Sequence, residues 1–380
     1  MRSPIQKALF CLALLGSSVL ASVQVLHLED AMDLAFCNNP SLQELKGRIA
    51  EAEARICQAR AQYYPTVRAD LSYQGGDAPS FYLFHTIDAG RLDSGTDFNE
   101  PGGLTNVGYG LSLEGELFNW GRTGHRLAAA CAGRQAEEHR SCDFANQLLG
   151  MITGIYLDTL KAAAAYETAE RSMALVGKQL DVAEKKLRKE VILRVDVLKL
   201  EVRLAEAQER SIRALSAQQQ AMQVLATLLG LEDATEFTTT AETAFPSIEP
   251  DAVEWEVPLT HAVWAAEADV VRACEDVQAA KTYTWPRLGY FAKAYVDSPD
   301  HPFRNERSNW VAGCALSWEL FTGGRVSGQK CEAQAALHQA EQRLCQARLQ
   351  TREQLAIAQL RKREAEERLR VSEIGERSAQ

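Results

Sequence analysis

The side chains that could perform chemistry in this chain are scattered. Its seven histidines include no pair spaced i, i+4, the spacing that places two imidazoles on one helix face for a metal ion. Gly108-Tyr109-Gly110 lacks the third glycine of a dinucleotide loop, and no glycine-rich turn is followed by Gly-Lys-Ser/Thr. The sequence also lacks a Gly-x-Ser-x-Gly nucleophile elbow. These patterns predict no catalytic, cofactor or metal site, so we expect a protein that is not an enzyme.

Charge and composition exclude another class of function. The formal net charge is −10, and we find no clustered basic face of the kind that neutralises phosphates, so nucleic acid is not an expected partner. Carboxylate pairs such as Glu137-Glu138 and Glu366-Glu367 lie in charge runs typical of solvated helix faces.

The most informative feature is an internal repeat of helix, strand, loop, strand and helix. In each copy a proline ends the first helix, because proline lacks the N–H and favours extended geometry before it. The first copy has Pro65, strands at about 66–75 and 106–117, and the junction Phe118-Asn119-Trp120-Gly121-Arg122. The second has Pro286, strands at about 287–297 and 309–319, and the junction Phe321-Thr322-Gly323-Gly324-Arg325.

The strands alternate between apolar and polar residues, which predicts one apolar and one polar face. Each is about ten residues long, which is the length that a tilted strand needs to cross a bilayer. A half-buried soluble sheet is the alternative, but the long connections favour a membrane barrel. Four strands are too few to close such a barrel, so closure needs several copies of the chain.

The helices that follow are long. No proline interrupts the chain between Gly121 and Lys189, and one helix over 122–188 would be about 100 Å long. Apolar residues step 3, 4, 3, 4 through residues 166–187 and again through 197–228, which is typical of a left-handed coiled-coil seam. The helix would turn near 191–195, and Gly230 would end its return. We therefore expect a helical hairpin over 120–230.

The remaining segments complete the predicted organisation. Residues 1–21 have a basic start, an apolar run and a small-residue site, which is typical of a cleaved signal peptide. The first repeat would occupy 22–230, an acidic connector 231–258, and the second repeat 259–380 with a long helix over 322–378. No other apolar stretch looks long enough for a spanning helix. Ser41 and Glu44 form a candidate capping box.

Eight cysteines remain after the signal peptide. They lie singly in helical or strand patterns without a Cys-x-x-Cys, so we expect mostly small buried side chains, although disulfides remain an alternative for an exported chain. Their positions are Cys37, Cys57, Cys131, Cys142, Cys274, Cys314, Cys331 and Cys345.

Taken together, the sequence resembles the TolC-type outer-membrane efflux protein family, the outer membrane factors. The resemblance covers about residues 26–380. It depends on three features: the segment 26–67, the two strands that each lead into a repeat junction, and Arg194-Val195-Asp196-Val197-Leu198. It implies a mainly α fold with a β-barrel part: a homotrimer shares one barrel in outer-membrane lipid, and its helices reach through the periplasm toward an adaptor (membrane fusion protein) and an inner-membrane pump. No cofactor is implied.

The resemblance also assigns residues. An adaptor would dock at the hairpin tip, formed by Leu193, Arg194, Val195, Asp196 and Val197; the alternative for Asp196 is that it caps the returning helix. The polar strand residues Arg68, Asp70, Glu114, Lys293 and Glu319 would face the lumen. The repeat junctions comprise Phe118, Gly121, Arg122, Phe321, Gly324 and Arg325. Loops 75–105 and 298–308 would be extracellular.

Two departures from the family pattern keep other functions open. The second repeat is shorter before its strand, and the sequence stops in the second long helix, where family members continue with a final helix. The leading hypothesis is a passive exit duct for efflux or type I secretion. The alternatives are a periplasmic coiled-coil scaffold or adaptor, and a truncated, non-conducting family member.

Overall fold

A computed structural model describes residues 24–93, 95–97, 99–231, 237–240, 260–299 and 307–379. The expected signal peptide, most of the acidic connector and most of the 298–308 loop lie outside these residues. The chain divides into two compact units, one comprising Met1–Arg48 and Arg140–Glu256 and the other Ile49–His139 and Val257–Gln380. Helices α3 (Pro40–Ala61) and α5 (Arg122–Leu187) contribute residues to both units. The mainly α fold class with a few strands is confirmed.

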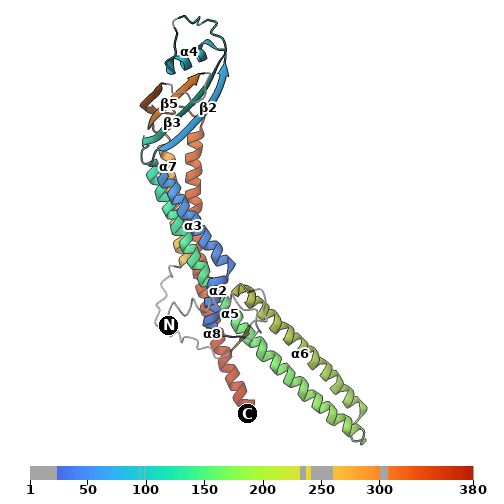
Figure 1. The fold of residues 1–380 in the computed structure, drawn as a ribbon. Coiled ribbons are helices and arrows are strands. Elements are labelled where there is room, and N and C mark those ends of the chain that lie inside the picture. The colour runs from blue at the N-terminus through green and yellow to red at the C-terminus, as the bar shows by residue number, and fades with distance from the viewer. Residues whose placement is uncertain are drawn as a thin grey trace. The chain divides into compact units, whose positions relative to one another are not determined.

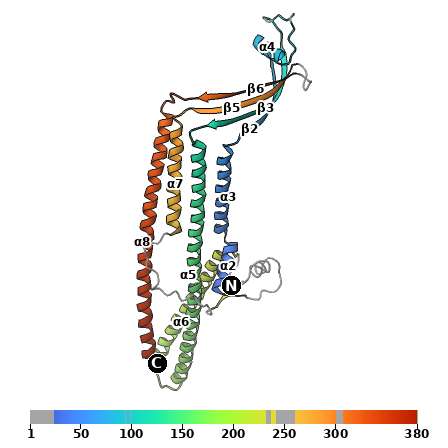
Figure 2. The same ribbon diagram turned by 90° about the vertical axis from the view of Figure 1, so that its left-hand side faces the viewer.

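The second unit contains the four repeat strands in one antiparallel sheet. The strands are β2 (Thr66–Gly76), β3 (Leu104–Phe118), β5 (Arg287–Pro299) and β6 (Ser308–Ser317), in the order β2-β3-β5-β6. They run side by side in Figure 2 and are joined in continuous register except for an irregularity between Glu116 and Phe118. Each repeat supplies one strand pair, and the two repeats meet where β3 pairs with β5.

Each strand of the sheet is connected to a helix, directly or through a short junction. Helix α7 (His261–Thr282) precedes β5 and packs against α8 (Arg325–Ala379), with Arg348 and Glu267 paired at 2.9 Å and Thr260 and Thr351 bonded at 3.2 Å. The first turns of α5 contact α7 through His125 and Glu275 at 2.7 Å.

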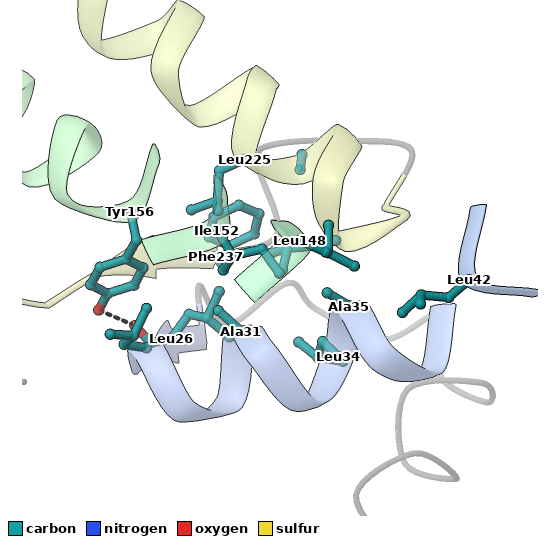
Figure 3. Packing of buried hydrophobic residues seen from close by; sticks show 13 residues of the cluster. Leu26, Ala31, Leu34, Ala35, Leu42, Leu148, Ile152, Tyr156, Leu225 and Phe237 are labelled. Carbon is teal, nitrogen blue, oxygen red and sulfur yellow. Dashed lines mark hydrogen bonds between the residues drawn. The ribbon is translucent and has the colours of Figure 1, made fainter. Parts of the chain in front are cut away.

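The other unit is built around an apolar cluster (Figure 3). It joins α2 (Leu28–Asn38), the middle of α5, the end of α6 (Arg194–Leu229), and a parallel strand pair, β1 (Gln24–Leu26) and β4 (Phe237–Thr239). Tyr156 is fully buried there and donates its hydroxyl proton to the carbonyl oxygen of Leu26 at 2.8 Å. At the end of α6, Gly230 adopts a φ of 73°, and a Cβ at this position would lie 2.7 Å from the carbonyl oxygen of Asn38.

The helical hairpin of α5 and α6 has the predicted seam. Every position at the 3, 4 spacing is buried or half-buried, and Ala207, Leu225 and the polar Ser211 are buried. Ser211 donates a hydrogen bond to Glu170 across the hairpin. The chain turns over 188–193, so α5 ends one residue earlier than expected.

Three local predictions were wrong. The N-cap of α3 is not Ser41 but Asn39, whose side-chain oxygen accepts from the Ser41 backbone N–H at 2.9 Å, with Pro40 at the first helical position. The eight described cysteines are exposed rather than buried, and none of them forms a disulfide. Among the described residues, α5 also contains an apolar window long enough to span a membrane. A single such window is weak evidence for a span, and Leu148 and Ile152 of α5 belong to the buried cluster.

Candidate functional site

The four-stranded sheet separates polar from apolar side chains. Strand pairing places Arg68, Ser112 and Lys293 side by side, and it places Asp70 and Glu114 on the same face, because directly paired residues and alternate residues share a face. Arg68 and Glu114 form an ion pair at 3.1 Å, and Ser112 donates to Asp70 at 3.1 Å. Four of the five polar residues selected from the sequence therefore share one face.

Glu319 is the exception. Strand β6 ends at Ser317, so Glu319 lies in the segment between β6 and α8, and its prediction as a strand residue was wrong. Its carboxylate accepts from Arg325 at the start of α8. Glu319 therefore forms an ion pair at the second repeat junction.

The opposite face of the sheet is apolar and exposed. Leu71 at the centre of β2 is 68% exposed and Trp310 of β6 is 80% exposed. Leu111, Leu113, Ala292 and Ala294 lie between them across the sheet. A continuous apolar sheet face of this kind is costly in water and marks a surface that another apolar phase or protein covers.

Both edges of the sheet have unused pairing capacity. Within the described residues β2 pairs only with β3, and β6 pairs only with β5. An open edge leaves backbone N–H and C=O groups without partners, which lipid cannot satisfy. The sheet can therefore enter a bilayer only if further strands cover β2 and β6.

The two repeat junctions have the same backbone geometry. Trp120 and Gly121 have φ values of 58° and 80°, and the matching Gly323 and Gly324 have 58° and 90°. Each junction is followed by a capped helix: the Thr123 backbone N–H donates to the Asn119 side chain, and the Val326 N–H donates to Thr322 Oγ1. Arg122 is buried against Thr282 and stacks on the Tyr283 ring at 4.3 Å. The two repeats therefore share the backbone conformation of the turn that connects each strand to its long helix.

Aromatic side chains gather beside these junctions. Phe118, Trp120 and Trp285 are in contact, with ring centroids 5.0 Å and 5.1 Å apart, and Trp318 and Phe321 are exposed nearby in the chain. The Trp120 indole N–H donates to the Pro286 carbonyl at 2.7 Å. Amphipathic aromatic residues at one end of an apolar band are typical of a membrane–water interface.

At the tip of the hairpin, exposure differs between neighbouring residues. Leu193, Arg194 and Val195 are exposed, whereas Val197 is 5% exposed and belongs to the seam. Asp196 is not the N-cap, because Leu193 occupies that position; Asp196 lies in the first turn of α6, where its carboxylate is 3.9 Å from Lys199. A carboxylate there interacts favourably with the helix dipole.

Sequence reasoning missed one element of the site, helix α4 (Pro79–Asp88), which was expected to be part of a loop. Its side chains reach the sheet: His85 Nδ1 lies 3.0 Å from Asp297 Oδ1, and Asp88 accepts from the Tyr295 hydroxyl at 3.0 Å. Pro79 at the start of the helix followed by Phe81-Tyr82-Leu83-Phe84 was the available signal.

Comparisons with known proteins agree with this arrangement. The outer membrane efflux protein family model matches residues 31–231 and 260–380. The chain is 27% identical over 339 residues to protein CyaE of Bordetella pertussis, covering 86% of this chain and 67% of that protein. It is 26% identical over 314 residues to the fusaric acid resistance protein FusA of Burkholderia cepacia, covering 78% of this chain and 56% of that protein.

Solved structures have the same fold at low sequence identity. A membrane protein from Pseudomonas aeruginosa superposes with a TM-score of 0.72 at 19% identity, covering 90% of this chain and 75% of that chain. The outer membrane protein VceC of Vibrio cholerae gives a TM-score of 0.68 at 20% identity, covering 85% and 75%. With the family model matching most of its length, the chain belongs to the outer membrane efflux protein family.

Proposed function

We propose that this chain is one subunit of a passive outer-membrane exit duct for efflux or type I secretion. The observation that carries the proposal is the sheet itself, with an exposed apolar face, a polar face and two open edges. Pairing β2 of one copy with β6 of the next would satisfy both edges and place the apolar face against lipid. The polar face, with Arg68, Asp70, Glu114 and Lys293, would then line the lumen.

The family and its relatives support the finer parts of the proposal. The resemblance to TolC-type proteins favours three copies. Three four-stranded sheets would supply about twelve strands, which is enough for a closed spanning barrel. The α5–α6 hairpin would extend into the periplasm, with Leu193, Arg194 and Val195 available to an adaptor that connects the duct to an inner-membrane pump. The relative FusA is a fusaric acid resistance protein, which is consistent with an efflux role for this chain.

A matched pair of substitutions tests the orientation of the sheet. Leu71→Arg places a charge on the apolar face at the middle of β2 and should cost about 2 to 4 kcal/mol of barrel stability in a bilayer. Gln74→Arg adds the same charge on the polar face of the same strand and should be tolerated. The readouts are the yield of trimer from detergent-extracted outer membranes and single-channel conductance in planar lipid bilayers.

The outcomes separate the candidate functions. Discrete conductance steps from the wild type and Gln74→Arg, with little trimer from Leu71→Arg, support the duct. Equal trimer yields from both variants contradict the assignment of the faces. A soluble monomer in the wild type would instead favour a periplasmic scaffold built on the α5–α6 hairpin.

A further inference from the structure

We propose that α4 lies inside the duct, where it narrows the end of the lumen opposite the repeat junctions and favours the passage of cations. The proposal rests on the proposed function, because it requires the polar face of the sheet to line a lumen. Helix α4 belongs to the segment between β2 and β3. Because Gly76 and Leu104 are direct partners in the sheet, a short turn could connect the two strands without this segment.

The side chains that α4 contacts identify the face on which it lies. Asp297 pairs with Gly108, which pairs with Ser72, and Tyr295 pairs with Gly110, which pairs with Asp70. All these positions belong to the polar face. Because His85 of α4 contacts Asp297 and Asp88 of α4 contacts Tyr295, the helix is docked on the polar side of the sheet rather than on its apolar side.

The docking contacts are numerous and partly buried. Asn106 is 2% exposed and donates to Asp297 Oδ1 at 2.6 Å beside His85. Asn309 of β6 donates to the Asp88 backbone carbonyl at 2.8 Å, and Arg91 donates to the Pro299 carbonyl at 3.0 Å. These bonds connect the segment to β3, β5 and β6. Buried polar groups cost free energy unless they are bonded, so this interface favours one fixed position for α4.

A cavity remains between α4 and the sheet, with a volume of about 330 Å³. The ionisable side chains that line it include three carboxylates, Asp70, Asp88 and Asp297, one ammonium group, Lys293, and the imidazole of His85. Lys293 lies over the Tyr295 ring at 5.0 Å, and Ser72 contributes a hydroxyl. Carboxylates therefore outnumber the permanent cation, and a ring of such groups from several copies would raise the local concentration of cations.

Replacing the segment tests the constriction. Because Gly76 and Leu104 are paired, residues 77–103 can be exchanged for an Asn-Gly turn without changing the sheet register. If α4 occupies the lumen, the shortened protein conducts with larger single-channel steps than the wild type. Unchanged step size in a trimer that still conducts would overturn the proposal while leaving the duct intact. Absence of conductance from wild-type trimers would contradict the proposed function itself.

Point substitutions test the preference for cations. The double variant Asp70→Asn with Asp88→Asn removes two carboxylates, and we expect the cation-to-anion permeability ratio, measured from reversal potentials in a salt gradient, to fall about twofold or more. Asp93→Asn is the control, because Asp93 is an exposed residue of the same segment that does not line the cavity. An equal ratio in the double variant and in the control would overturn the electrostatic part of the proposal. A lower ratio in the double variant alone would support it.

Discussion

At the residue scale, the repeat junctions explain why glycine occurs where a strand becomes a long helix. Gly121 and Gly324 both have positive φ, a region that costs other residues about 1 to 2 kcal/mol. The conformation is therefore imposed by the turn rather than by neighbouring contacts, since a Cβ at Gly324 would meet nothing within 4 Å.

Gly121→Ala should consequently lower stability although there is room for the methyl group. The nearest atoms to the new Cβ belong to His125 at 3.8 Å, so the expected loss of about 1 to 2 kcal/mol comes from backbone strain. Gly124→Ala, one turn into α5, is the control and should be neutral or stabilising, because alanine favours a helix. Thermal unfolding of the detergent-solubilised protein measures both. A Gly121→Ala protein as stable as Gly124→Ala would contradict the role of the turn.

Tyr156→Phe should also destabilise the protein, for a different reason. The Tyr156 hydroxyl donates to the Leu26 carbonyl and accepts from the Thr240 N–H at 3.3 Å, so it connects α5 to the ends of both short strands. Its removal leaves these groups buried without their partner, at a cost of about 1 to 3 kcal/mol. The effect can be measured by unfolding the protein in denaturant and monitoring how well residues 24–42 resist a protease. Tyr166→Phe, half-buried on the same helix, is the control and should change little.

At the element scale, sequence periodicity predicted most of the fold. The period of two located the four long strands, and the 3, 4 spacing located the hairpin seam, because both patterns repeat over many residues. The parallel pair β1 and β4 was missed, since each strand has three residues and they lie far apart in the sequence. The polar sheet face could be predicted from alternation. The docking of α4 could not, because His85, Asn106 and Asp297 come together only in the folded chain.

The hairpin seam gives a direct prediction about these elements. Ala207 is buried between α5 and α6, whereas Ala205 lies on the exposed side of α6. Ala207→Glu inserts a longer, charged side chain into a closely packed seam and should separate the two helices. Ala205→Glu introduces the same residue with little effect. Faster amide hydrogen exchange over 166–187 and 197–218 in Ala207→Glu alone is the expected result, and equal protection in both variants would contradict the seam.

At the scale of the whole molecule, an exposed sheet face and an exposed hairpin tip imply different neighbours. In the proposed duct, the apolar face would contact lipid and the open edges would pair with further copies of the chain. At the tip, the seam between the two helices is packed, and Leu193 and Val195 are exposed beyond it. Assembly and docking should therefore be separable by mutation.

Leu193→Asp tests that separation. Leu193 is 72% exposed at the start of α6, so an aspartate there should leave the hairpin folded while removing apolar surface from the proposed adaptor site. Val202→Asp, exposed two turns further along α6, is the control. We expect both variants to form trimers with wild-type conductance, and only Leu193→Asp to lose in-cell crosslinking to the adaptor of its own export system. If Leu193→Asp crosslinks to the adaptor as well as the wild type does, the docking site does not include Leu193. If Leu193→Asp fails to form trimers, the tip also contributes to assembly.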